Sequence, residues 1–141
     1  MATYTAANAL KKISTGDESG TWGDSTNNNF DIIDRASNGF VSIALSATSY
    51  TLELSTTSVL SDGHYKAIKF TGTPSDTCTV TLQQNNKARI YMILNSTNQT
   101  LSITQGSGAN VTIVSGKSAI ILADGAGSSA AVTDFTSLIL N

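Results

Sequence analysis

The sequence predicts an all-β protein: an antiparallel β-sandwich or jelly-roll-like body with an extended N-terminal arm and one short helix. After Gly39, large apolar residues alternate with small or polar ones, which is the period of half-buried strands. Turn-forming residues interrupt this alternation at spacings of roughly eight to twelve residues, and no helical pattern lies between the segments. The 141 residues suffice for one core. We therefore expect an arm and helix over 1–39 and a β-sandwich body over 40–141.

The first segment, Met1 to Trp22, is small and polar, and glycines are frequent between Gly16 and Gly23. Frequent glycine favours irregular backbone, so this segment is expected to be an arm or loop. Trp22 is the only tryptophan. Two interpretations stay open: its ring anchors the chain in a partner's pocket, or it seals the bottom of the chain's own body.

One short helix is predicted over Asn27 to Asn38, with Ser25 or Thr26 as its N-cap and Gly39 closing it. Three apolar residues are spaced for one side of it, namely Phe30, Ile33 and Ala36. A helix of this length is unstable alone. Its apolar side is therefore expected to dock on something.

The strands expected after the helix share a period of two. They cover residues 40–45, 50–54, 65–70, 77–82, 88–94, 100–103, 110–114, 118–122 and 135–140. Two of them contain nearly continuous apolar runs, Tyr91 to Leu94 and Ala119 to Leu122. Such runs are typical of strands covered on both faces. The second cover is either a neighbouring subunit or the chain's own body.

The composition bears on partners and compartment. Only 13% of residues are charged, and the eight Lys and Arg form no basic run, so nucleic acid is not an expected partner. No apolar stretch is long enough for a signal peptide or a membrane span, which predicts a chain made in a cytoplasm and not bound to membrane. Cys78 is the only cysteine and is expected to be a buried apolar residue.

No motif predicts catalysis, a cofactor or a metal. His64 follows Asp62-Gly63 and is interpreted as an exposed turn histidine, since no nucleophile-elbow sequence accompanies it. Gly116-Lys117-Ser118 imitates the end of a phosphate-binding loop, but a strand pattern follows where that loop needs a helix. The acidic residues lack the spacing of a calcium loop.

The stretch from Thr15 to Asp34 carries a resemblance, together with the strand pattern from Gly39 to Leu45 that follows it. Its core is Gly20-Thr21-Trp22-Gly23 followed by the Asn-rich helix start at Asn27. This third of the chain resembles a module of tail-fibre and other virion structural proteins of tailed bacteriophages, notably marine ones. Those proteins are generally homotrimeric appendages with β-rich bodies.

The resemblance implies a non-enzymatic virion protein, assembled in the host cytoplasm, that binds copies of itself, as a homotrimer, and phage capsid or tail proteins. Because the chain finishes after one body, we expect a short accessory such as a capsid decoration or cement protein or a small head or tail spike. The residues assigned to attachment or subunit packing are Gly20, Trp22, Gly23, Asn27, Asn29, Phe30 and Ile33.

Two other function classes are weighed against this hypothesis. A tail-fibre-type module could bind a host surface glycan through aromatic side chains, but Tyr50, Tyr65, Phe70 and Tyr91 fall on positions expected to face the core. A small hydrolase would need paired acids or a nucleophile with its base. Loss of activity in a His64→Ala variant would revive that class.

Overall fold

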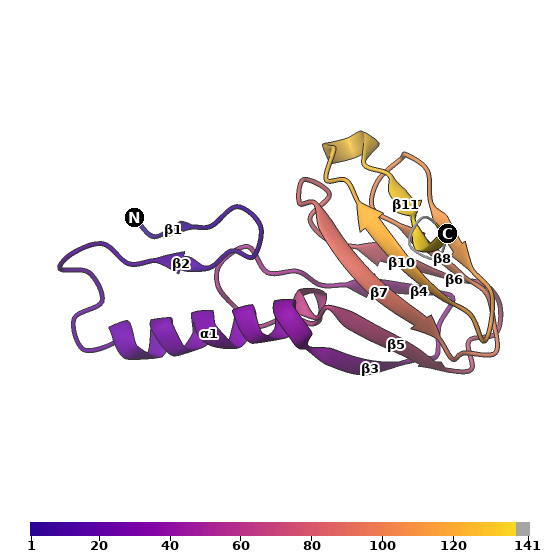
Figure 1. Ribbon diagram of the computed structural model, residues 1–141, viewed down its shortest axis with the longest axis horizontal. Coiled ribbons are helices and arrows are strands. Elements are labelled where there is room, and N and C mark those ends of the chain that lie inside the picture. The colour runs from indigo at the N-terminus through magenta and orange to yellow at the C-terminus, as the bar shows by residue number, and fades with distance from the viewer. Residues whose placement is uncertain (138–141) are drawn as a thin grey trace.

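The computed structural model describes residues 1–137 and consists of a β body from which one helix and an N-terminal arm extend (Figure 1). Its helical elements are α1 (Trp22–Asn38) and the short 3-10 turns η1 (Asp62–His64) and η2 (Gly127–Ser129). The arm strands are β1 (Thr3–Tyr4) and β2 (Lys11–Lys12). The body strands are β3 (Phe40–Leu45), β4 (Ser49–Leu52), β5 (Ala67–Gly72), β6 (Cys78–Leu82), β7 (Arg89–Asn95), β8 (Leu101–Thr104), β9 (Val111–Ile113), β10 (Ser118–Ala123) and β11 (Val132–Asp134).

The body contains two sheets, of order β11-β10-β7-β5-β3 and β4-β6-β8-β9. From β3 to β8 successive strands alternate between the two sheets, so that β3, β5 and β7 are parallel in one sheet and β4, β6 and β8 are parallel in the other. Parallel neighbours need a crossover connection. Here a strand of the opposite sheet serves as each crossover, and residues 40–104 therefore wind as stacked coils.

The expected β-rich class is confirmed, but the expected antiparallel pairing is wrong for these coils. Antiparallel pairs occur where the chain reverses, between β8 and β9, β7 and β10, and β10 and β11. The period-two pattern was the same for both arrangements, because alternation reports which face of a strand is buried and not which strand lies beside it.

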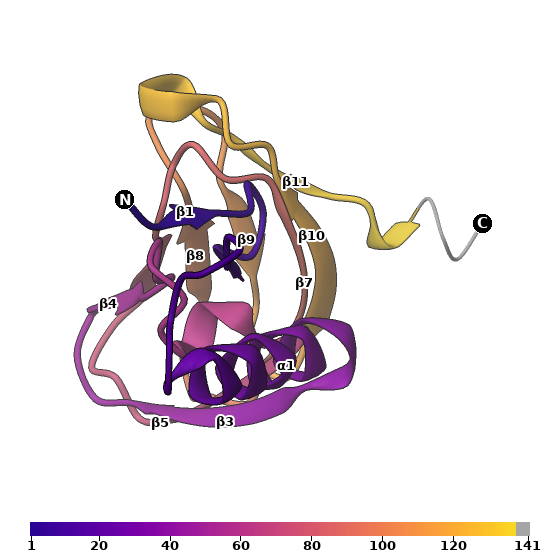
Figure 2. The same cartoon turned by 90° about the vertical axis from the view of Figure 1, so that its left-hand side faces the viewer.

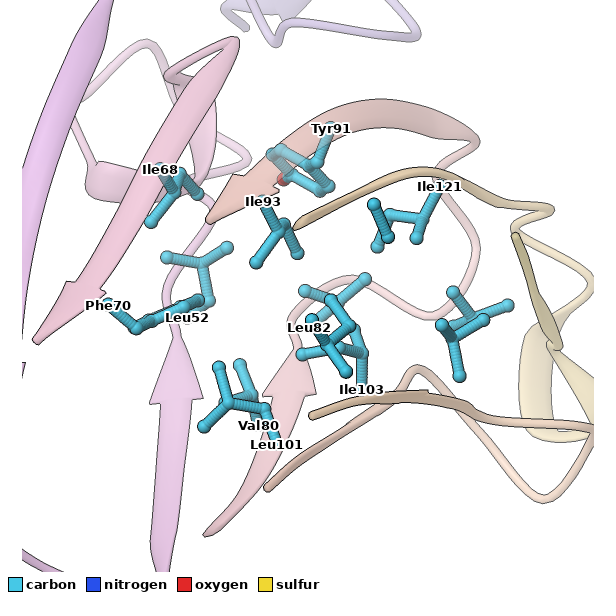
Figure 3. Close-up of a cluster of buried hydrophobic side chains, with 14 of the residues drawn as sticks. Leu52, Ile68, Phe70, Val80, Leu82, Tyr91, Ile93, Leu101, Ile103 and Ile121 are labelled. Atoms are coloured by element: carbon cyan, nitrogen blue, oxygen red, sulfur yellow. The ribbon is translucent and has the colours of Figure 1, made fainter. Parts of the chain in front are cut away.

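The core lies between the two sheets, as Figure 3 shows. Alternate residues of each strand point inward and are almost fully buried; they include Leu52, Ile68, Phe70, Val80, Leu82, Tyr91, Ile93, Leu101, Ile103 and Ile121. Each fully buried side chain of this size contributes about 1.5–3 kcal/mol. Cys78 is also fully buried in this cluster, as expected.

Helix α1 ends where the sequence predicted and begins five residues earlier, at Trp22 instead of Asn27. The predicted end at Asn38, followed by Gly39, is confirmed. A Cβ on Gly39 would lie 2.6 Å from the Arg35 carbonyl oxygen, which explains why glycine occupies this position. Ile32 is the residue of α1 that is buried, whereas Phe30 and Ile33 are exposed. The expected apolar side of the helix is thus uncovered in the described chain, and its docking on a partner stays a prediction.

The last predicted strand, 135–140, falls partly on residues 138–141, which lie outside the described residues. The described strand in this region is β11, which ends at Asp134. The other predicted strands are found within one or two residues of their expected bounds.

Candidate interaction surface

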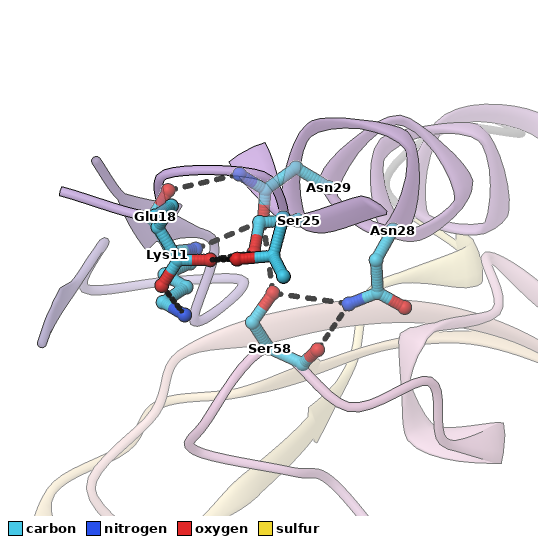
Figure 4. A network of polar contacts seen from close by, with 7 residues as sticks. Lys11, Glu18, Ser25, Asn28, Asn29 and Ser58 are labelled. Carbon is cyan, nitrogen blue, oxygen red and sulfur yellow. Dashed lines mark hydrogen bonds and ion pairs between the residues drawn. The ribbon is translucent and has the colours of Figure 1, made fainter. Parts of the chain in front are cut away.

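The arm and α1 form one unit that is held together by polar contacts (Figure 4). Lys11 forms an ion pair with Glu18, and Ser25 Oγ donates to Glu18 Oε2 at 2.6 Å. Asn29 pairs with the backbone of Lys11 in both directions, since it accepts from Lys11 N at 2.9 Å and donates to Lys11 O at 2.8 Å. The ion pair raises the pKa of Lys11 and lowers the pKa of Glu18.

A second set of contacts ties this unit to the loop after β4. The side chain of Asn28 donates to the backbone and the hydroxyl of Ser58, and Ser58 Oγ donates to Asn29 Oδ1 at 2.9 Å. Asn29 is thus a structural residue within the chain, while Asn27 is exposed. Sequence reasoning missed Asn28, because three consecutive asparagines give no signal of which ones face the arm.

The opposite side of α1 is uncovered in the described chain. Trp22 and Phe30 are each 61% exposed and Ile33 is 44% exposed. Trp22 is the first residue of the helix and seals no part of the body, so the interpretation of this ring as a plug is wrong. We call Phe30, Ile33 and Ala36 the helix stripe, since they are spaced by three residues along one face.

The glycines around Trp22 have no packing reason within the chain. Gly20 adopts φ +83°, which favours glycine, but a Cβ there would meet nothing within 4 Å. Gly23 lies in the first turn of α1, and a Cβ there would also enter open space. Glycine inside a helix costs about 0.5–1 kcal/mol relative to alanine. The space beside Trp22 and Gly23 is therefore open to a close approach from another molecule.

A second apolar area covers the outer face of the five-stranded sheet. Its most exposed members are between 37% and 57% accessible, and they are Phe40, Ile90, Met92, Leu94 and Leu122. Among the outward positions of β3, β5, β7 and β10, all of which the structure describes, Lys69 alone is charged. The runs at Tyr91–Leu94 and Ala119–Leu122 thus have one covered and one open face in the isolated chain.

A hollow of about 300 Å³ lies where this sheet face meets α1 and the arm. Its lining includes Ala36 from the helix stripe, Ala7 and Asn8 from the arm, and Ile90 and Leu122 from the sheet. Figure 2 shows β7 and β10 above one side of α1, and Figure 1 shows that the end of the helix nearest the body is the part that approaches these strands. Ala36, at the body end of the helix stripe, is therefore the part of the stripe that lies near the sheet face.

One open groove, of about 480 Å³, lies on another side of α1. Its lining includes Tyr4, Asp24 and Asn28 together with the loop at 57–60, which adds the apolar Val59 and Leu60. Amide and carboxylate groups beside an aromatic ring can bind a polar ligand such as a sugar. The core-facing aromatics cannot, because Phe70 and Tyr91 are buried and Tyr50 and Tyr65 are packed against the core.

His64 is fully buried in η1, so its expected exposure is wrong. Its Nδ1 accepts from the backbone N–H of Ser61 at 3.2 Å and lies 3.0 Å from Ser61 Oγ. The first of these contacts is one half of a capping box, in which the Ser61 side chain also accepts from the His64 backbone N–H. Burial lowers the pKa of His64, and the nearby Arg89 charge lowers it further.

The remaining sequence motifs have structural roles. Gly116 forms a turn with φ +78°, and Ser118 opens strand β10, so the phosphate-loop imitation lacks its helix as expected. Burial raises the pKa of the Cys78 thiol. Among residues 1–137 no three His, Cys, Asp or Glu side chains are grouped as metal ligands. Within the same residues no helix is both long and apolar enough to cross a membrane.

Comparisons with protein-family models, curated proteins and solved structures found no match to this chain.

Proposed function

We propose that this chain is a non-enzymatic structural protein of a tailed-phage particle, a short surface accessory of the capsid or tail. Its N-terminal segment docks on the particle and its β body is displayed. The observation that supports this proposal is the exposed Trp22 beside Gly23 at the far end of an arm and helix that extend from the body (Figure 1). An aromatic ring beside an open glycine can fill a pocket while a partner's backbone approaches closely.

Low charge supports a permanent assembly. Charged residues make up 13% of the chain, about half the usual share of a soluble domain. Polar contacts then come from Ser, Thr and Asn, which hydrogen-bond across an interface without burying an unpaired ion. A homotrimer, which the N-terminal sequence resemblance implies, is part of the proposal.

Two substitutions at the far end of α1 test the docking. In particles of the phage that encodes the chain, Trp22→Ala and Gly23→Ala should lower incorporation at least tenfold, measured by immunoblot of purified particles and by antibody labelling in electron micrographs. Gly23→Ala should at the same time stabilise the isolated chain by about 0.5–1 kcal/mol. A docking loss together with a stability gain separates the site from a folding defect.

Val114→Ala is the matched control, because Val114 is 56% exposed on the body. It should leave incorporation unchanged. Normal incorporation of the Trp22→Ala chain would contradict docking through this end, and absence of the wild-type chain from particles would contradict the virion assignment.

A second candidate function, binding of a host glycan or receptor, is favoured by the groove that contains Tyr4, Asp24 and Asn28. If it is correct, the purified chain gives a glycan-array signal that Tyr4→Ala and Asp24→Asn both abolish. Retention of that signal in both variants would place any sugar site elsewhere. The Trp22→Ala variant should bind the array normally, which distinguishes this function from docking on the particle.

A further inference from the structure

The helix stripe has the spacing of a helix that packs on another helix. Phe30 and Ile33 are three residues apart, and Thr26 and Ser37 extend the same line by four residues on either side. This alternation of three and four is the seam of a coiled coil, in which two or more helices share an apolar line. Phe30 and Ile33 are the apolar members of this line and are exposed in the described chain, while Thr26 and Ser37 are polar, so the line can pack against a second helix at its centre.

The sheet face is a second apolar patch, which meets the helix stripe at the hollow beside Ala36. Across the sheet, the paired residues Phe40, Ala67, Met92 and Ile120 form one row. Ile90 and Leu122 form the next row and line the hollow with Ala36. The surface formed by the helix stripe and the β7 and β10 face therefore includes this hollow, which Lys66 and Arg89 also line.

The size of this surface fits a stable interface. Covering the exposed parts of Phe30, Ile33, Phe40, Ile90, Met92, Leu94 and Leu122 would remove roughly 700 Å² per copy from water, close to the share per partner in a standard interface. Sheets with parallel strands are seldom left open on one face. Lys69 on β5 and Lys66 at the hollow can keep their charges in water at the ends of flexible stems. Arg89, which also lines the hollow, donates to the side chain of Asn8 at 2.6 Å.

We infer that copies of this chain associate through this surface in parallel, with the helix stripe and the β7 and β10 face of each copy turned toward a common axis. The parallel direction rests on the proposed function, because only in a parallel assembly do all N-terminal segments lie at one end and reach the particle together. A second copy is the occupant because it presents a seam and a sheet face of matching length.

Sedimentation of the purified full chain tests the surface. The wild type should be an assembly at about 100 µM, while Ile33→Glu on the helix and Met92→Glu on the sheet should each give monomers. Val114→Glu, a matched exposed position on the body, should sediment as the wild type does. Far-ultraviolet circular dichroism will show that all variants fold, because exposed substitutions rarely change stability by more than about 0.5 kcal/mol.

Cysteine cross-linking tests the direction. Thr26→Cys lies on the seam, so in a parallel assembly it should oxidise to a covalent link between copies, while buried Cys78 stays free. In an antiparallel dimer, the helix would cover the sheet of its partner. Thr26→Cys would then link only to Met92→Cys in a mixed sample, and that result would overturn the parallel arrangement.

Failure of this inference and failure of the proposed function give different results. A monomeric wild type, or an assembly that survives Met92→Glu, overturns the inference even if particle docking still depends on Trp22. An intact assembly that is absent from phage particles supports the surface and overturns the proposed function.

Discussion

At the scale of single residues, the least expected feature is a buried asparagine with all four side-chain hydrogen bonds made. Asn95 donates to the carbonyls of Gln99 and Ile113, each at 2.8 Å, and accepts from the backbone and hydroxyl of Thr97. It is 1% exposed at the end of β7. A half-satisfied network would be destabilising, so the complete one fixes the turn between the two sheets.

Asn95→Ala should lower the free energy of unfolding by about 3 kcal/mol, because it removes the amide donor to the Gln99 and Ile113 carbonyls and leaves the buried Thr97 N–H without its acceptor. Urea unfolding followed by circular dichroism measures this change. Asn110→Ala is the control, since Asn110 is exposed and donates one bond, to Ser102. Equal stability of the two variants would contradict the role given to Asn95.

At the scale of elements, the sequence predicted what depends on local pattern and missed what depends on contacts across the chain. The end of α1 was predicted because Gly39 is a local signal. Its start was missed because the glycines around Trp22 favour irregular backbone, whereas the Glu18 carbonyl accepts from Trp22 N at 2.8 Å and begins the helical turn. The choice of Ile32 over Ile33 as the buried residue depends on which elements pack against α1, and no local pattern encodes that.

A comparison of two substitutions, at Asn29 and at Asn27, tests how the arm is held to α1. Asn29→Ala removes both bonds to the Lys11 backbone and the bond from Ser58, so exchange of the Lys11 amide should become about tenfold faster. Asn27→Ala, two residues away and exposed, should leave exchange unchanged. Hydrogen exchange of the body strands should be the same in both variants, and faster exchange throughout the body would contradict a local role.

At the scale of the whole molecule, strand positions followed from the sequence but their partners did not. Phe40, Ala67 and Met92 are neighbours in the sheet, yet they are separated by a complete coil of the chain. Alternation is identical for a strand paired with its successor and for one paired with the strand after that. The apolar runs in the sequence indicated the open sheet face, because they suggested that these strands are covered on both faces. A neighbouring subunit was one of the two interpretations of the second cover.

The whole chain contains few charged residues, so the pH dependence of its free energy of unfolding rests on few titrating groups. Folding lowers the pKa of His64. Near pH 6.5, the ordinary value, His64 of the unfolded chain therefore takes up a proton while His64 of the folded chain stays neutral. The stability due to neutral His64 is therefore complete above that pH and is lost as pH falls below it, by up to about 1.4 kcal/mol per pH unit. The lowered pKa of Glu18 adds a further loss below its ordinary value of 4.5.

Urea unfolding between pH 8 and pH 5, at one protein concentration so that assembly does not vary, measures this profile. The wild type should hold a constant free energy of unfolding from pH 8 to about 7 and then lose stability towards pH 5. His64→Gln should be less stable at pH 8, because the capping box changes, but its profile should be nearly flat down to pH 5. An equal slope in both proteins would show that another group takes up the proton, since His64 is the one histidine in the sequence.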